Sequence, residues 1–208
     1  MAIDRNRGKA AGILGGIVVF EGFFVVWQAW GDVAGYLRWL GFLPGRHWPQ
    51  PVGYATAAVV AIGFVALSAR LPSVRENLIR PSWLKVLAIG VAVAAGILEE
   101  IAFRPLLMNA LQERGMGPVV QVVLSGLGFG VIHGVWAFFG KKWHAGAGAI
   151  VATGLLGSAL AVVYLVSGRS VAPCIAAHFA LNVFAEPGLV LAALRGEMGR
   201  RRTAVVRG

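Results

Sequence analysis

Long apolar runs, separated by short stretches rich in arginine and lysine, are the feature of this sequence that most restricts its fold. Several runs reach or approach the roughly 20 residues that a helix needs to cross a bilayer. Hydrophobic residues make up 58% of the 208 residues and charged residues only 13%, far from the balance of a soluble domain. The alternation of a membrane β-barrel is missing from the sequence. The fold class expected is therefore all-α, a polytopic transmembrane helix bundle.

Hydropathy predicts about six spans within a single integral membrane domain that covers residues 1–208. The candidate spans are residues 10–30, 51–69, 84–110, 118–139, 146–167 and 171–194. The first run follows three basic residues, as a secretory signal would, but it contains Glu21 and lacks a convincing cleavage site. We therefore expect a retained first helix.

The basic residues outside the spans set the expected orientation. Of the 19 lysine and arginine residues, 14 fall on the side that carries both termini, 4 fall on the other side, and Arg104 lies within a span. The positive-inside rule then places both termini in the cytoplasm, and we expect the cytoplasmic (inner) membrane of a prokaryote. Because topology accounts for the net charge of +10, we expect the lipid bilayer as a partner and no nucleic acid.

Three ionisable residues lie inside the third span. Glu100 and Arg104 are four residues apart in the favourable order, so they share a helix face and are predicted to form a structural ion pair. Glu99 is rotated by about 100° from that face. It is left without a local partner, and this makes it the better candidate for chemistry, because an intramembrane charge is costly and marks function.

Two later spans each carry a histidine with a partner at four-residue spacing. Phe129 and His133 share one face of the fourth span, beside a stripe of glycines (Gly126, Gly130 and Gly134) that favours close helix packing. His178 and Asn182 share one face of the sixth span. Taken alone, the motif with His133 fits a buried structural histidine as well as a functional one. The motif with His178 and Asn182 alone fits hydrogen bonding between helices as well as a functional role.

The joint pattern is more specific than its parts. A carboxylate, two imidazoles and an amide would converge in a low-dielectric bundle, where proton transfer and oxyanion stabilisation are strongest. These are the parts of a hydrolase. Pro187 is expected to kink or end the last helix, and Glu186 to reach the interface outside the site. Glu21 is expected to be paired or to reach toward the interface.

Glu99-Glu100-x-x-x-Arg104, Phe129-x-x-x-His133 and His178-x-x-x-Asn182 together resemble the motifs of the CPBP family of intramembrane proteases. The same family is also called the CAAX-protease and bacteriocin-processing family, or the Abi family. The resemblance covers about half of the chain and defines an expected catalytic core at residues 85–194. It implies that a peptide bond of a membrane-associated peptide or protein is hydrolysed within the membrane.

Carried over by position, the resemblance implies that Glu99 with His133 activates the attacking water. His178 and Asn182 would stabilise the tetrahedral oxyanion, while Glu100 and Arg104 give structural support. The family has been described both as metalloproteases and as metal-free glutamate proteases. Zinc on Glu99, His133 and His178 is the alternative, but a compact HExxH arrangement is missing, so we favour the mechanism without a cofactor or metal.

The depth of the motif residues in the membrane bears on the expected substrate. Glu99 and His178 fall in the outer half of the membrane by residue count, although His133 fits less well. This depth favours a secreted peptide precursor or a C-terminal sorting signal over a prenylated cytoplasmic protein as the substrate.

A proton-coupled transporter or channel with a Glu/His relay is the alternative function, although the first two spans lack the counterpart motifs of an inverted repeat. A catalytically idle scaffold would not need the full residue set.

Overall fold

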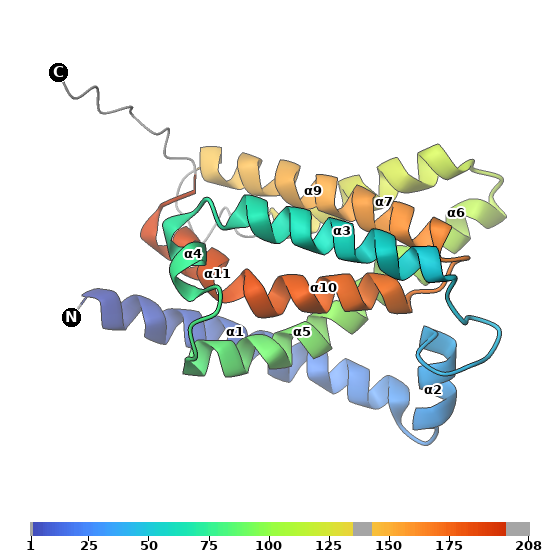
Figure 1. Ribbon diagram of the computed structural model, residues 1–208, viewed down its shortest axis with the longest axis horizontal. Helices are drawn as coiled ribbons and strands as arrows, with labels where there is room; N and C mark the ends of the chain where they lie inside the picture. Colours follow the sequence, from blue (N-terminus) through green and yellow to red (C-terminus); the bar gives the residue numbers. More distant parts are fainter. Residues whose placement is uncertain (1, 135–142, 199–208) are drawn as a thin grey trace.

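The computed structural model describes residues 2–134 and 143–198 as a bundle of helices that run alongside one another (Figure 1). The elements are α1 (Ala2–Ala29), α2 (Val33–Leu40), α3 (Pro51–Ser68), α4 (Pro72–Asn77), α5 (Trp83–Ile101), the π-helix η1 (Ala102–Met108), α6 (Asn109–Glu113), α7 (Pro118–His133), α9 (Trp143–Val166), α10 (Ala172–Phe184) and α11 (Glu186–Arg195). The described part of the chain contains helices and no strand, which confirms the all-α fold class.

Proline marks the start of several helices, because its fixed φ and missing N–H suit the first turn. It stands in the first turn of α3, α4, α7, α10 and α11. The start of α5 uses a different device, since the Ser82 side chain accepts a hydrogen bond from the backbone N–H of Lys85. The long helices are therefore bounded by signals in the sequence.

Four helical segments have the length and composition of a membrane span. They are Arg5–Ala29, Pro51–Ser68, Trp83–Glu113 and Ala147–Val166. Helices α10 and α11 form a fifth if they are counted as one span bent by 50°. The bend confirms the prediction for Pro187, the second residue of α11. Large apolar side chains such as Phe20 and Val59 point outward from these helices, as lipid-facing residues do.

The structure therefore supports four or five of the six predicted spans. The fourth expected span, residues 118–139, begins at Pro118 as predicted, but its described helix has only 16 residues and is shorter than a full crossing. Residues 135–139 of that span lie outside the described part of the chain, as do Lys141, Lys142 and the basic residues from Arg200 onward, which contributed to the charge count.

Two packed regions hold the bundle together. One contains Leu160 and Tyr164 of α9, with buried side chains from α3 and α10. The other contains Leu14 of α1, with Val91 of α5 and Leu191 of α11. Helix α5 packs against both α1 and α10, and α7 packs along α9. The end of α5 is therefore held between elements distant in the sequence, and this is where the candidate site lies.

Close packing of α7 on α9 depends on the glycine stripe. A Cβ atom on Gly130 would lie 2.6 Å from the backbone oxygen of Ile150, and one on Gly126 would lie 2.8 Å from that of Gly154. No side chain larger than hydrogen fits at such distances without moving a helix. The predicted close approach of another helix is confirmed, and it fixes the height of His133 at the end of α7.

Candidate active site

A cavity of about 210 Å³ lies between α1, α5, α7, α10 and α11. Its polar lining consists of Glu21, Glu99, His133, His178, Asn182 and Glu186, and its apolar lining of Ile17, Val91, Ala95 and Ile132. The four residues expected to be catalytic, Glu99, His133, His178 and Asn182, therefore share one cavity although they come from three helices. A structural role for His133 alone, or hydrogen bonding between helices by His178 and Asn182 alone, does not account for this convergence.

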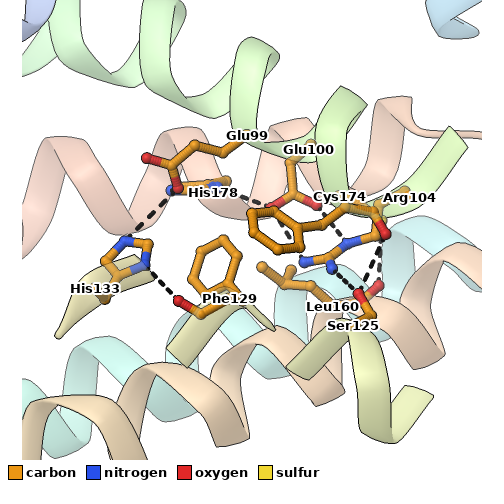
Figure 2. Close-up of polar contacts among 10 residues, drawn as sticks. Glu99, Glu100, Arg104, Ser125, Phe129, His133, Leu160, Cys174 and His178 are labelled. Atoms are coloured by element: carbon orange, nitrogen blue, oxygen red, sulfur yellow. Dashed lines mark hydrogen bonds and ion pairs between the residues drawn. The ribbon is translucent and has the colours of Figure 1, made fainter. Parts of the chain in front are cut away.

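The carboxylate of Glu99 faces both histidines (Figure 2). Its Oε2 atom lies 3.6 Å from Nε2 of His133 and 3.9 Å from Nε2 of His178. Both distances exceed that of a direct hydrogen bond, and Oε2 accepts no hydrogen bond from any described residue. One carboxylate oxygen and two ring nitrogens thus lie close enough to contact the same small molecule.

Glu100 and Arg104 form the predicted ion pair behind the cavity. Nε of Arg104 donates to Oε2 of Glu100 over 2.8 Å, and both side chains are fully buried. Nη1 of Arg104 donates to the hydroxyl of Ser125 over 2.6 Å, which joins α7 to the pair. A buried charge needs such complete pairing, because an unpaired one costs several kcal/mol. Neither Glu100 nor Arg104 lines the cavity.

The π-helix η1 separates Glu99 and Glu100 from the rest of their span. It contains Pro105, which lacks the N–H of a regular helical turn and clashes with the carbonyl oxygen four residues earlier. The ladder widens locally, as in the π-bulges that are frequent at functional sites. Arg104 lies in this segment and still reaches Glu100 in the last turn of α5.

Each histidine is oriented through its Nδ1 atom, so that Nε2 faces Glu99. Nδ1 of His178 lies 2.9 Å from Oε1 of Glu100 and donates to it, because the carboxylate that pairs with Arg104 only accepts. Nδ1 of His133 lies 2.8 Å from the backbone oxygen of Phe129 and likewise donates. Neutral His133 therefore presents an accepting Nε2, whereas the Glu100 carboxylate favours a protonated, donating Nε2 on His178.

The ring of Phe129 fills the space between these groups. It stacks on His133 with ring centres 4.4 Å apart and meets the ring of His178 at 64°, with centres 5.9 Å apart. The guanidinium of Arg104 lies 5.7 Å from the same ring centre. Phe129 is 1% exposed, so it excludes water from the ion pair while it supports His133.

Two carboxylates in the cavity were not assigned to the site by the sequence. The expectation that Glu186 lies outside the site is wrong, because its side chain lines the same cavity as Glu99. The bend between α10 and α11 turns the start of α11 inward, which helical spacing alone does not predict. Glu21 also lines the cavity, and its Oε2 atom is buried without a hydrogen bond to any described residue.

A second, mostly apolar cavity of about 300 Å³ adjoins the first and shares His133 and Glu186 with it. Its other lining residues include Ser68 at the end of α3, Gly148 near the start of α9, and Leu189 of α11. These segments lie at the end of the bundle that carries the start of α1 (Figure 1). The outer-half position inferred from residue counts is not supported by this arrangement, because the second cavity extends toward the end where the chain begins.

The zinc alternative requires three protein ligands about 2.0–2.2 Å from one ion. Within residues 2–134 and 143–198, no group of three His, Cys, Asp or Glu side chains is arranged to hold a metal ion.

Residues 81–184, half of the 208-residue chain, match the family model for "Type II CAAX prenyl endopeptidase Rce1-like" proteins. The chain belongs to this family. Neither the curated proteins nor the solved structures contain a match to it. Membership in the Rce1-like family identifies a protease of CAAX type that is embedded in the membrane, and it favours this activity over a transporter. The matched segment contains all seven motif residues, whereas Glu21 and Glu186 fall outside it.

Proposed function

We propose that this protein is a metal-free intramembrane endopeptidase in which Glu99 and His133 activate a water molecule. One observation carries the proposal: Oε2 of Glu99 lies within 4 Å of Nε2 of both histidines, in a cavity that Asn182 also lines. A general base must reach the proton that it removes directly or through one water, and these distances meet that condition.

The four residues divide the reaction between them. Glu99 takes a proton from water, with the accepting Nε2 of His133 holding that water, and the oxygen attacks the carbonyl carbon of the scissile peptide bond. His178 and Asn182 donate hydrogen bonds to the oxyanion of the tetrahedral intermediate. The proton on Glu99 then passes to the leaving nitrogen as the C–N bond breaks, so a new carboxylate and a free amine result.

Glu100 and Arg104 support this chemistry without contact with the substrate. The Glu100 carboxylate favours the imidazolium form of His178, which supplies the N–H that the oxyanion requires. Arg104 in turn keeps Glu100 ionised and fixes its direction. The ion pair therefore acts through His178.

The substrate that we propose is a membrane-associated peptide or protein. The protein would act in the inner membrane of a prokaryote with both termini in the cytoplasm. The buried cavity would admit an extended segment, because a helical substrate keeps its peptide bonds shielded.

The test uses the purified full chain in liposomes, with a pool of membrane-anchored peptides whose fragments are identified by mass spectrometry. Wild type should cleave a subset of the pool and retain its activity in the presence of a strong zinc chelator. Glu99→Gln keeps the shape but removes the proton acceptor, so its rate should fall by at least about 10²-fold. Glu113→Gln is the matched control, since this exposed glutamate ends the same span.

Full activity of Glu99→Gln would refute the assigned base. Loss of activity on chelation, restored by added zinc, would replace the metal-free mechanism with a zinc-bound water. Proton flux without any peptide cleavage would favour the transporter.

A further inference from the structure

Two carboxylates of the catalytic cavity have no part in the mechanism above. Glu21 reaches it from α1, and Glu186 reaches it from the first residue of α11. Both lie in membrane-embedded segments, where a carboxylate is stable only if it is paired, protonated or in contact with a polar ligand. Neither has an ion-pair partner among the described residues.

The described lining offers Glu21 and Glu186 a single cation, the imidazolium of His178, which already donates to Glu100. Neither a lysine nor an arginine belongs to the described lining of the two cavities. The nearby Arg104 is fully buried and occupied by Glu100 and Ser125. Glu99 adds a third carboxylate, which must remain ionised to act as a base. The lining is thus acidic, with three carboxylates against the one imidazolium of His178.

A second observation indicates that the cavity receives a ligand. Asn182 is 7% exposed and lines the cavity, and no hydrogen bond ties its amide to another described residue. Buried amides and carboxylates are nearly always hydrogen-bonded, so groups left open in a common cavity are typical of a binding site. Oε2 of Glu21 is buried and open in the same way.

We propose that Glu21 and Glu186 bind a cationic group of the substrate, the side chain of a lysine or arginine close to the scissile bond. The inference rests on the proposed endopeptidase function, and it adds to that function a preference for a positively charged substrate residue. A cation in this position offsets the two unpaired carboxylates and lowers the cost of keeping Glu99 ionised.

The second cavity adds a preference for apolar substrate residues next to the basic one. Glu186 lies where the two cavities meet, and beyond it the lining is apolar, with Phe64, Leu67 and Leu189. A substrate with a basic residue at the scissile bond and apolar residues next to it would satisfy both cavities. Such a junction occurs where a membrane-spanning segment meets a basic flank.

The activity test uses a pool of liposome-anchored peptides with randomised residues between the anchor and a polar tail. Cleaved peptides should be enriched in lysine or arginine within two residues of the scissile bond. Acetylation of that lysine should raise KM about tenfold with little change in kcat, because only substrate binding is lost. In Glu21→Gln and Glu186→Gln the KM values for the lysine and acetyl-lysine peptides should become similar. Glu21→Asp keeps the charge and should keep the preference, and Glu113→Gln should match wild type.

A binding test that needs no catalysis separates this inference from the proposed function. Hexylammonium chloride should raise the unfolding temperature of Glu99→Gln more than 1-hexanol does, and the further change Glu186→Gln should abolish the difference. Cleavage without a preference for basic residues, or equal stabilisation by the two probes, would overturn the cation site. Stabilisation by hexylammonium without cleavage of any peptide would support the cation site and overturn the protease.

Discussion

His178 donates Nδ1–H to Oε1 of Glu100 over 2.9 Å, which ties α10 to the last turn of α5. The same carboxylate accepts from Arg104, so one buried glutamate joins the ion pair to the catalytic cavity. The second glutamate of the Glu-Glu motif therefore does more than neutralise the arginine. It sets which nitrogen of His178 faces Glu99.

Glu100→Gln should impair catalysis in the protein that still folds, although it also lowers stability by several kcal/mol because Arg104 stays buried with only a neutral partner. The amide oxygen can still accept a hydrogen bond from Arg104, but the amide no longer stabilises an imidazolium at His178. We expect kcat to fall by at least about 10²-fold, since a carboxylate that orients a catalytic histidine contributes up to about 10⁴-fold elsewhere. Steady-state cleavage of a lipid-embedded peptide measures kcat, and the unfolding temperature in detergent is the control. A variant with normal kcat would show that His178 works without its carboxylate partner.

Arg104→Ala should primarily reduce stability. The change leaves the fully buried Glu100 without its cation and Ser125 without its donor, so the free energy of unfolding should fall by about 3–5 kcal/mol. Ser125→Ala removes two hydrogen bonds, one from Nη1 of Arg104 and one to the backbone oxygen of Phe103, but it leaves no charge unpaired, and a smaller loss of about 1–3 kcal/mol is expected. Reversible unfolding in mixed micelles would give both values. Equal stability of Arg104→Ala and wild type would mean that Glu100 is neutral in the folded protein.

Local spacing predicted part of the site and could not predict the rest. The pair Glu100–Arg104 follows from four-residue spacing on one helix, and it survives even the π-helix at Pro105. The contact between Glu100 and His178 joins residues 78 positions apart, and it depends on how α10 packs against α5. No periodicity within either helix encodes that packing.

The carboxylates outside the motifs show the same limit. Beyond Lys9, Glu21 is the only charged residue of helix α1 and belongs to no polar stripe, so the sequence does not indicate that its face turns toward α5. The sequence predicts a kink or a helix end at Pro187, which the bend of 50° between α10 and α11 confirms, but it does not predict the direction of the bend. The bend carries Glu186 into the cavity and not to the interface. A single bend angle thus separates an interfacial residue from a cavity residue.

Gly130→Val should separate α7 from α9. Its Cβ atom would lie 2.6 Å from the backbone oxygen of Ile150, so the helices must shift, at a cost of about 1–3 kcal/mol. The shift moves His133 away from Glu99, and cleavage should be lost even in protein that remains folded. Gly63→Val is the matched control, because nothing lies within 4 Å of a Cβ atom there. Equal loss in both variants would point to a general effect of valine rather than to helix contact.

The orientation in the membrane can be tested by cysteine labelling. Cys174 is buried, so Cys174→Ala gives a suitable background. Arg80 and Arg114 are exposed near opposite ends of the third span, and the positive-inside rule places Arg80 in the cytoplasm. An impermeant maleimide should label Arg114→Cys in intact cells and Arg80→Cys only after permeabilisation. The reverse pattern would invert the proposed topology.

His133→Ala and Glu99→Gln should be strongly non-additive. Both residues are proposed to hold the same water, with Oε2 of Glu99 3.6 Å from Nε2 of His133. Each change should lower kcat by about 10²-fold, and the double variant should be little slower than either one, as expected for groups that act as a unit.

Asn182→Ala provides the contrast for this cycle, because the amide is proposed to act on the oxyanion rather than on the water. Its loss should also cost about 10²-fold, and it should multiply with the loss from His133→Ala. The three single variants and the two doubles are compared by single-turnover cleavage, with circular dichroism confirming equal helix content. If His133→Ala and Glu99→Gln multiply instead, the two residues act on separate steps, and His133 is then better assigned to the leaving nitrogen than to the water.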